Sequence, residues 1–274
     1  MKNTTFIIKT FERPEALRTL IRSIRKFYPT VKILIADDSR KPIPVEGKNI
    51  EYFVLPFDSG LSYGRNFLVD LVETKYTLLL DDDFIFTKDT KIEKFVKVLE
   101  TTKIDIISGN VELDEALVNY HGLLELKGKT LHYKHGNRGE INGIEIMDLV
   151  LNFFLARTET LKDNPWDNDL KVAEHTDWML RTKDLKKGFS PEVVVVNTKS
   201  DYSPGMKRYR QRGREFTYMW MKKHGIEKIV DFKGMEFTTP IKRDSAWSEI
   251  QQAALENERR RQERIASNNK RNMQ

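Results

Sequence analysis

The chain of 274 residues contains no cysteine, which excludes disulfide bonds, a thiolate nucleophile and cysteine-ligated zinc. It also lacks any apolar run of the roughly 18 to 20 residues that a membrane-spanning helix needs. The apolar part of its first ten residues is too short for a signal peptide and predicts a strand instead. Together these absences favour a cytoplasmic protein.

Several common functional motifs are missing as well. The sequence has no Walker-type phosphate loop, no Gly-x-Ser-x-Gly elbow and no zinc-binding pattern. His121, His132 and His135 are not spaced to share one metal-binding helix face. We therefore expect none of these three histidines to be functional.

Basic charge is in excess, with a formal net charge of +6 at pH 7. Such an excess favours a nucleic acid, an anionic membrane or a phosphorylated substrate as the partner. One Gly-bounded basic cluster, residues 207–214, contains Arg208 and Arg212 and suits a loop that folds over a diphosphate and excludes water. Its Tyr209 between basic residues would equally suit stacking on RNA bases, and a solvated helix face is a third interpretation.

Strand-like and helix-like segments alternate through the first half of the chain. Apolar and β-branched runs predict strands at residues 5–10, 31–36, 51–55, 76–80 and 105–111. Apolar residues recur at helical spacing between these strands, first in the segment after Pro14. This rhythm predicts an α/β fold with a mostly parallel central sheet flanked by helices.

The second half is less regular. Residues 114–143 are polar and predict an irregular excursion or a hairpin, and residues 144–156 predict a strand that passes under the site. We expect one domain at residues 1–244, followed by a basic helical or disordered tail at residues 245–274. Interspersed glutamates in this tail argue against deep membrane insertion, although contact with an anionic membrane surface stays open.

Three consecutive aspartates, Asp81, Asp82 and Asp83, follow the apolar strand 76–80. Carboxylates packed so closely repel one another, so a structural role without a cation is unfavourable. Their hard oxygen atoms suit Mg²⁺ or Mn²⁺, which in turn commonly hold a phosphate or diphosphate. A plain acidic turn is the alternative.

Other polar residues fall at the same kind of position. Thr10 ends the first predicted strand, and Asp37 and Asp38 end the second. Because ligands bind at the carboxyl ends of parallel strands, these ends together predict a nucleotide site, although the two aspartates would also suit an Asx turn or a helix cap. Arg65, which follows Gly60 and Gly64, could pair with a phosphate or a base carbonyl, or lie on the surface.

A third cluster contains Glu174, His175 and Asp177. On a helix, Glu174 and Asp177 are three residues apart and share a face. A carboxylate in a partly dry cleft suits the deprotonation of an acceptor hydroxyl. The alternative is a charged first helical turn that the helix dipole stabilises.

Seven motifs occur in one order along the chain: Lys9-Thr10-Phe11 with Arg13, Arg25 to Val31, Ile35 to Ser39, Gly64-Arg65-Asn66, Thr74 to Tyr76, Leu80 to Phe84, and Val150 to Arg157. In this set and order the chain resembles the β-1,4-N-acetylgalactosaminyltransferases of the ganglioside-synthase type, which belong to the wider GT-A glycosyltransferases. The resemblance extends over residues 5–220.

The resemblance implies a GT-A nucleotide-sugar fold, a UDP-sugar donor, Mn²⁺ or Mg²⁺, and inversion at the anomeric carbon. It implies uridine contacts from Thr10, Asp38 and Arg65, and a position near the ribose and metal for Asp81 and Asp82. Asp83 would be the surest metal ligand, together with Asp81. The predicted nucleotide-binding set also includes Arg13, Asp37, Arg208 and Arg212.

Three residues are candidates for the acid–base chemistry that the resemblance implies. Asp177 would be the base, with His175 also matching the family and Glu174 as the rival base. Asn197 departs from the family pattern, because members often place a metal-ligating histidine at this point. That departure puts the third protein ligand and strict metal dependence in question.

We therefore predict an inverting glycosyltransferase that moves N-acetylgalactosamine or a related hexose from UDP to an acceptor hydroxyl. The acceptor, whether a glycan, a glycolipid or a protein, is open, and we expect no nucleic-acid partner. A metal-dependent nucleotidyltransferase, which would release pyrophosphate, is one alternative. A non-catalytic RNA-binding module is the other, and it would bind RNA with a steep salt dependence.

Overall fold

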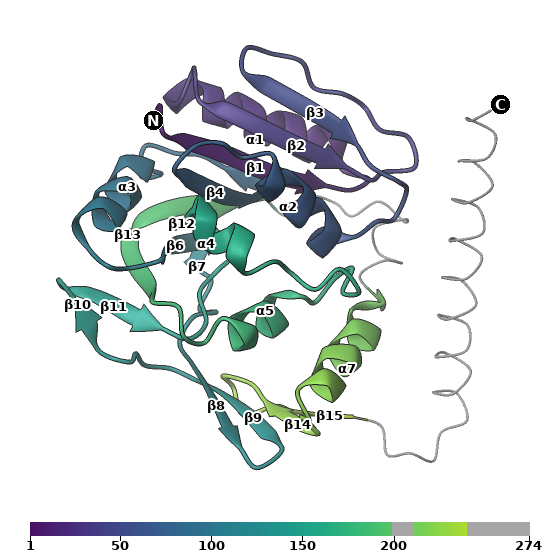
Figure 1. Cartoon of the computed structure of the whole chain (residues 1–274), viewed down its shortest axis with the longest axis vertical. Helices are drawn as coiled ribbons and strands as arrows, with labels where there is room; N and C mark the ends of the chain where they lie inside the picture. The colour runs from purple at the N-terminus through teal and green to yellow at the C-terminus, as the bar shows by residue number, and fades with distance from the viewer. Residues whose placement is uncertain (199–210, 240–274) are drawn as a thin grey trace. The chain divides into compact units, whose positions relative to one another are not determined.

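The computed structural model describes residues 1–198 and 211–239 (Figure 1). It divides the chain into two compact units, Met1–Glu236 and Phe237–Gln274. Except for β15 at the boundary, the strands and helices discussed below belong to the first unit. The predicted tail at residues 245–274 lies outside the described residues, so the predicted boundary after residue 244 stays a prediction.

A large mixed sheet forms the centre of the first unit. Its strand order is β10-β11-β13-β6-β12-β4-β1-β2-β3, with β5 beside β13 and β7 beside β6. The strands are β1 (Thr4–Thr10), β2 (Lys32–Asp37), β3 (Ile50–Val54), β4 (Tyr76–Asp81), β5 (Phe84–Ile85), β6 (Ile106–Leu113), β7 (Ala116–Leu117), β10 (Glu140–Ile141), β11 (Ile144–Met147), β12 (Phe154–Arg157) and β13 (Lys187–Asn197).

The direction of the strands confirms the prediction of a mainly parallel sheet. Strands β3, β2, β1 and β4 run parallel to one another, and β13 runs parallel to β6. Strand β12 is inserted antiparallel between β4 and β6. The predicted strand at residues 144–156 is in fact two strands, β11 and β12, separated by a loop that carries Asn152.

Helices cover both faces of this sheet (Figure 1). They are α1 (Pro14–Phe27), α2 (Leu61–Asp70), α3 (Ile92–Thr101), α4 (Thr158–Asp163), α5 (His175–Arg181) and α7 (Gly213–Lys223). Helices α1 and α3 pack into one apolar core, and residues of α2, α4 and α5 pack into the other. Each fully buried leucine or isoleucine in these cores contributes about 1.5–3 kcal/mol relative to exposure.

A second, smaller sheet contains the hairpin that was one of the two predictions for residues 114–143. Strands β8 (Leu123–Lys127) and β9 (Thr130–Lys134) are antiparallel, and β14 (Lys228–Val230) joins β9 in parallel. A further short strand, β15, spans Glu236–Thr238. Among the described residues, no helix is long and apolar enough to cross a membrane.

The register of the central strands positions the candidate site. Thr10 of β1 pairs with Asp37 of β2, and Lys9 pairs with Asp81 of β4. The carboxyl ends of β1, β2 and β4 therefore lie at the same edge of the sheet. The chain leaves each strand at this edge, where it presents polar side chains instead of the apolar residues that precede them.

Candidate active site

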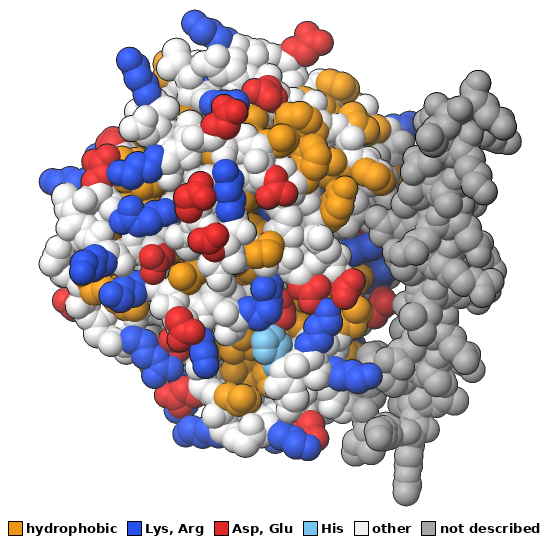
Figure 2. Space-filling model, in the orientation of Figure 1, with side chains coloured by type: hydrophobic (Ala, Val, Ile, Leu, Met, Phe, Trp, Pro, Cys, Tyr) orange, Lys and Arg blue, Asp and Glu red, His pale blue; other side chains and the backbone are white. Residues whose placement is uncertain are grey.

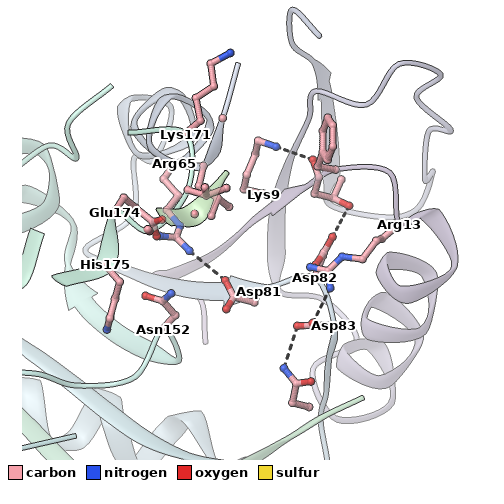
Figure 3. Close-up of a pocket in the computed structure, with 18 of the residues that line it drawn as sticks. Lys9, Arg13, Arg65, Asp81, Asp82, Asp83, Asn152, Lys171, Glu174 and His175 are labelled. Atoms are coloured by element: carbon pink, nitrogen blue, oxygen red, sulfur yellow. Dashed lines mark hydrogen bonds and ion pairs between the residues drawn. The ribbon is translucent and has the colours of Figure 1, made fainter. Parts of the chain in front are cut away.

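A cavity of about 790 Å³ opens at this edge of the sheet (Figure 3). Segments far apart in the sequence line it, from the ends of β1 and β4, the start of α2, the loop before β12, the start of α5 and the start of α7. The predicted site residues among its lining are Thr10, Arg13, Asp38, Arg65, Asp81, Asp82, Asp83, Glu174, His175 and Arg212. Asp37 and Asp177 are outside this lining, and Arg208 lies outside the described residues.

Arg13 provides the positive charge that the aspartate triplet needs. Its guanidinium donates to Oδ1 of Asp82 and, at 2.7 Å, to Oδ2 of Asp83. Thr10 Oγ1 donates to the second oxygen of Asp82 at 2.7 Å, and Asn197 Nδ2 donates to Oδ1 of Asp83 at 3.2 Å. Burial raises the pKa of Asp82 to about 6, against the opposing effect of Arg13.

Asp81 points away from this pair and toward Arg65. Its Oδ1 accepts from Arg65 at 3.1 Å, and about a third of its side chain is exposed. Burial raises the pKa of Asp81 to about 7, with further raising contributions from Asp83 and Asp82 and a lowering one from Arg65. Of Asp81 and Asp82, Asp81 therefore has the pKa closer to neutral pH.

Arg65 joins the aspartate edge to the start of α5. It is 1% exposed, and one guanidinium nitrogen donates to Glu174 Oε1 while another reaches Asp81. The guanidinium also lies 5.7 Å from the ring of Trp166. Two carboxylates thus accept from the Arg65 guanidinium, and its implied contact with uridine stays a prediction. The link to Glu174 spans 109 residues, so local sequence patterns gave no signal for it.

Lys9 is a buried site residue that sequence reasoning missed. Its ammonium donates to Asp38 Oδ1 and to the carbonyl oxygen of Thr10. A Cβ on Gly64, inside helix α2, would lie 2.3 Å from the Lys9 side chain. The absence of a side chain at Gly64 therefore leaves space for the lysine.

Adjacent residues Asp37 and Asp38 have different roles. Asp38 Oδ2 accepts from the backbone N–H of Gly60 at 2.7 Å, and its side chain lines the cavity. Asp37 accepts from the backbone N–H of Ser39 at 2.8 Å and from the Tyr52 hydroxyl. This is the Asx turn given as the alternative interpretation, and nucleotide binding by Asp37 stays a prediction.

The two carboxylates of the third cluster are separated in space. Glu174 is 2% exposed and lines the cavity, next to Ala173, whose φ of 57° is unusual for a residue other than glycine. Asp177 instead accepts from Arg181 Nε at 2.9 Å and from His224 Nε2 at 2.9 Å. Its carboxylate thus links α5 to His224, which follows α7, and the assignment of Asp177 as the base stays a prediction.

The electrostatics of Asp177 agree with that placement. Burial alone would raise the pKa of its carboxyl group, but the hydrogen bonds from His224 and Arg181 outweigh burial and lower it. An anion held by two donors is a weak proton acceptor. Glu174, the rival base, is the carboxylate at the cavity.

The start of α7 forms another wall of the cavity. Arg212 NH1 lies 3.3 Å from Asp58 Oδ2, which also accepts from Lys171 Nζ at 2.8 Å. Phe216 lines the cavity from the same helix. Arg212 thus lines the cavity, and its contact with a diphosphate stays a prediction. Lys171 is a second cation in the lining that sequence reasoning missed.

The residues present fit a hard divalent cation in part. Asp81 and Asp83 supply carboxylate oxygens at the cavity, which is the chemistry that Mg²⁺ and Mn²⁺ prefer. Within residues 1–198 and 211–239, no group of three or more acidic, histidine or cysteine side chains is arranged to hold a metal. A cation here would therefore need further ligands, and a diphosphate supplies oxygens of the right kind.

The mainly parallel sheet presents an aspartate triplet and a buried carboxylate in one cavity at its carboxyl edge, an arrangement typical of the GT-A fold. The family model described as Glycosyl transferase family 2 matches residues 5–189. The chain belongs to this family.

Curated relatives confirm the resemblance found in the motifs. The chain is 41% identical over 202 residues to "Beta-1,4 N-acetylgalactosaminyltransferase 1" of Homo sapiens, an alignment that covers 70% of this chain and 38% of the relative. It is 37% identical over 195 residues to "Beta-1,4 N-acetylgalactosaminyltransferase 2" of Mus musculus, with the same two coverages. The chain thus matches less than half of the length of these relatives.

Solved structures show the same fold at low sequence identity. S. aureus TarS 1-349 in complex with UDP-GlcNAc superposes with a TM-score of 0.53 at 14% identity, covering 80% of this chain and 65% of TarS 1-349. The mannosyltransferase PcManGT from Pyrobaculum calidifontis, in complex with GDP-Man and Mn²⁺, gives a TM-score of 0.52 at 12% identity, with 81% and 64% covered.

Proposed function

We propose that this chain transfers N-acetylgalactosamine, or a related hexose, from a UDP-sugar to an acceptor hydroxyl with inversion at the anomeric carbon. The observation that carries the proposal is the convergence of the aspartate edge, its paired cations and Glu174 on one cavity. The names of the curated relatives support N-acetylgalactosamine as the sugar.

In this proposal the nucleotide lies along the ends of β1 and β2, beside Thr10, Lys9 and Asp38. Arg212 and Lys171 lie at the cavity and suit the charge of the diphosphate. The acceptor oxygen forms a bond to the anomeric carbon as the bond from that carbon to the diphosphate oxygen breaks. UDP leaves with the electron pair, and the acceptor proton passes to Glu174.

Glu174 suits the role of base by position. It is buried at the cavity, and the guanidinium of Arg65 holds one of its two oxygens, so the carboxylate has a fixed orientation. Asp81 and Asp83 would hold Mn²⁺ or Mg²⁺, which when bound supplies positive charge that stabilises the departing diphosphate.

The proposal specifies the acceptor only as a glycan, a glycolipid or a protein that carries a hydroxyl group. A cytoplasmic location and a membrane contact through residues 245–274 are likewise expectations from the sequence.

Figure 2 shows a face on which Lys and Arg side chains are interspersed with Asp and Glu. This mixed pattern gives the RNA-binding alternative no continuous basic surface there.

A melting-shift comparison of UDP, UDP-N-acetylgalactosamine and UDP-galactose, each with and without Mn²⁺, tests the proposal. We expect the nucleotides to raise Tm, because ligands that bind only the folded state stabilise it. Release of UDP from the donor with an acceptor array then establishes transfer. Release of pyrophosphate from a nucleoside triphosphate, or no response to any uridine nucleotide, would overturn the proposal.

A further inference from the structure

One end of the cavity contains two buried polar atoms without a protein partner. Within the described part of the chain, neither Oδ1 of Asn152 nor Nδ1 of His175 has a hydrogen-bond partner. Both side chains line the cavity, on the same side as Glu174 and across from Arg13 (Figure 3). Buried polar atoms are nearly always satisfied in folded proteins, so two unsatisfied atoms in one cavity point to a ligand.

The hydrogen bond made by Nε2 of His175 determines whether Nδ1 is a donor or an acceptor. Nε2 lies 2.6 Å from the carbonyl oxygen of Val150, and a carbonyl oxygen can only accept, so Nε2 carries the proton. Burial lowers the pKa of His175 to about 4, so the ring is neutral near pH 7. Nδ1 is therefore an acceptor that needs an N–H or O–H donor.

The surrounding charges disfavour an anionic ligand group at this end. Glu174 and Asp81 line the same cavity, and the nearby guanidinium of Arg65 is already bonded to both of them. A neutral His175 and a neutral Asn152 offer no positive charge. The chemistry of this end thus favours an uncharged group that donates hydrogen bonds.

An apolar wall adjoins the two polar atoms. Leu151, which precedes Asn152, lines the cavity together with Val118 and Tyr120. The Tyr120 ring lies 6.1 Å from the His175 ring, and its hydroxyl is 3.4 Å from Thr176 Oγ1. Because that hydroxyl has a partner within the protein, the Tyr120 ring adds mainly apolar surface, which suits a methyl group.

We propose that Asn152, His175 and the adjoining apolar wall form a subsite that recognises the acetamido group of the donor sugar. The acetamido N–H donates to His175 Nδ1, the Asn152 amide bonds a neighbouring polar group of the sugar, and the acetyl methyl packs against Leu151. The ligand class is a nucleotide-linked N-acetylhexosamine, in preference to an unsubstituted hexose or a uronic acid. This inference rests on the proposed function, since it assigns a subsite within the same cavity.

Titration calorimetry in Mn²⁺ tests this subsite with four probes: UDP, UDP-N-acetylgalactosamine, UDP-galactose and UDP-glucuronic acid. We expect the wild-type chain to bind the acetamido sugar about tenfold more tightly than UDP-galactose, as for one or two net hydrogen bonds, and UDP-glucuronic acid most weakly of the three sugars. Equal affinity for the acetamido sugar and UDP-galactose would overturn the inference without any variant.

Two substitutions test which residues produce the preference for the acetamido sugar. His175→Gln keeps an amide N–H that can donate to the Val150 carbonyl but removes the Nδ1 acceptor, and Asn152→Ala removes the amide. We expect each to reduce the preference for the acetamido sugar to about twofold or less, whereas an unchanged preference in both variants would overturn the subsite. UDP alone serves as the reference ligand and shows whether each variant retains a folded nucleotide site.

His121 offers a matched control. Its Nδ1 is also buried without a partner among the described residues, and its ring stacks on Phe189 at 4.0 Å, but it is not part of the cavity lining. His121→Gln should leave the donor preference unchanged, and an equal loss there would overturn the assignment to the cavity. Absence of UDP binding by the wild-type chain would instead contradict the proposed function, so the two failures are distinguishable.

Discussion

The two ends of the cavity differ in how their polar groups are satisfied. At the end with the aspartates, Asp82 and Asp83 bond to Arg13, and Asp38 bonds to the buried Lys9. At the other end, Asn152 and His175 keep buried polar atoms without partners in the described chain. The first end is held in shape by its own ion pairs, whereas the second depends on a ligand to complete its hydrogen bonds.

Arg65 lies between these two ends, so removing it should have the largest effect on both. Arg65→Met leaves Glu174 and Asp81 without their buried cation, which should cost about 3–5 kcal/mol of unfolding free energy and abolish transfer. Urea unfolding measures the loss, with the exposed Arg18→Met as the control. A loss below about 1 kcal/mol would show that the network does not stabilise the fold.

Glu174→Gln tests the end of the cavity that carries the proposed base. The substitution removes the carboxylate and keeps the shape of the side chain. We expect kcat for transfer to fall by about 10²- to 10⁴-fold, because no carboxylate then accepts the acceptor proton. Calorimetry with UDP should show binding retained. Transfer at the wild-type rate would show that another residue is the base.

Asp177→Asn tests the assignment of this carboxylate to the contact between α5 and α7. The change weakens the bonds to Arg181 and His224, which should cost about 1–3 kcal/mol of stability, with a smaller loss of kcat than for Glu174→Gln. Parallel measurements of Tm and kcat compare the two variants. A folded Asp177 variant as inactive as the Glu174 variant would restore Asp177 as the candidate base.

The pH dependence of stability gives the smallest expected effect. Burial raises the pKa of Asp81 to about 7, above its unfolded value near 4, so the folded metal-free chain binds the proton more tightly. Stability should therefore fall by about 1–2 kcal/mol between pH 4 and pH 8, allowing for partial exposure of the side chain. With a chelator present, the unfolding free energy of Asp81→Asn should depend less on pH than that of the wild-type chain. Identical pH profiles for the variant and the wild-type chain would contradict this prediction.

The fold could be predicted from the sequence because its signals are local. Apolar runs and helical spacing indicated the strands and helices, and the parallel pairing of β1, β2 and β4 confirms that Thr10, Asp38 and Asp81 share an edge. The alternation of side chains along a strand could also have separated Asp37 from Asp38, since adjacent residues point to opposite faces.

The site was less predictable because its contacts connect distant segments. The Arg65–Glu174 pair spans 109 residues, and the His224–Asp177 pair spans 47. The family resemblance implied Asp177 as the base, but its partner His224 comes from the residue that follows α7. Which carboxylate faces the cavity thus depends on tertiary packing that no single-sequence pattern reveals.

The single guanidinium shared by Asp81 and Glu174 has a consequence for ligand binding. A donor or cation that bonded Asp81 would break its hydrogen bond to Arg65, and the guanidinium would then bond Glu174 alone. In the proposed reaction, binding of the donor would thereby change the hydrogen bonding of Glu174, the proposed base.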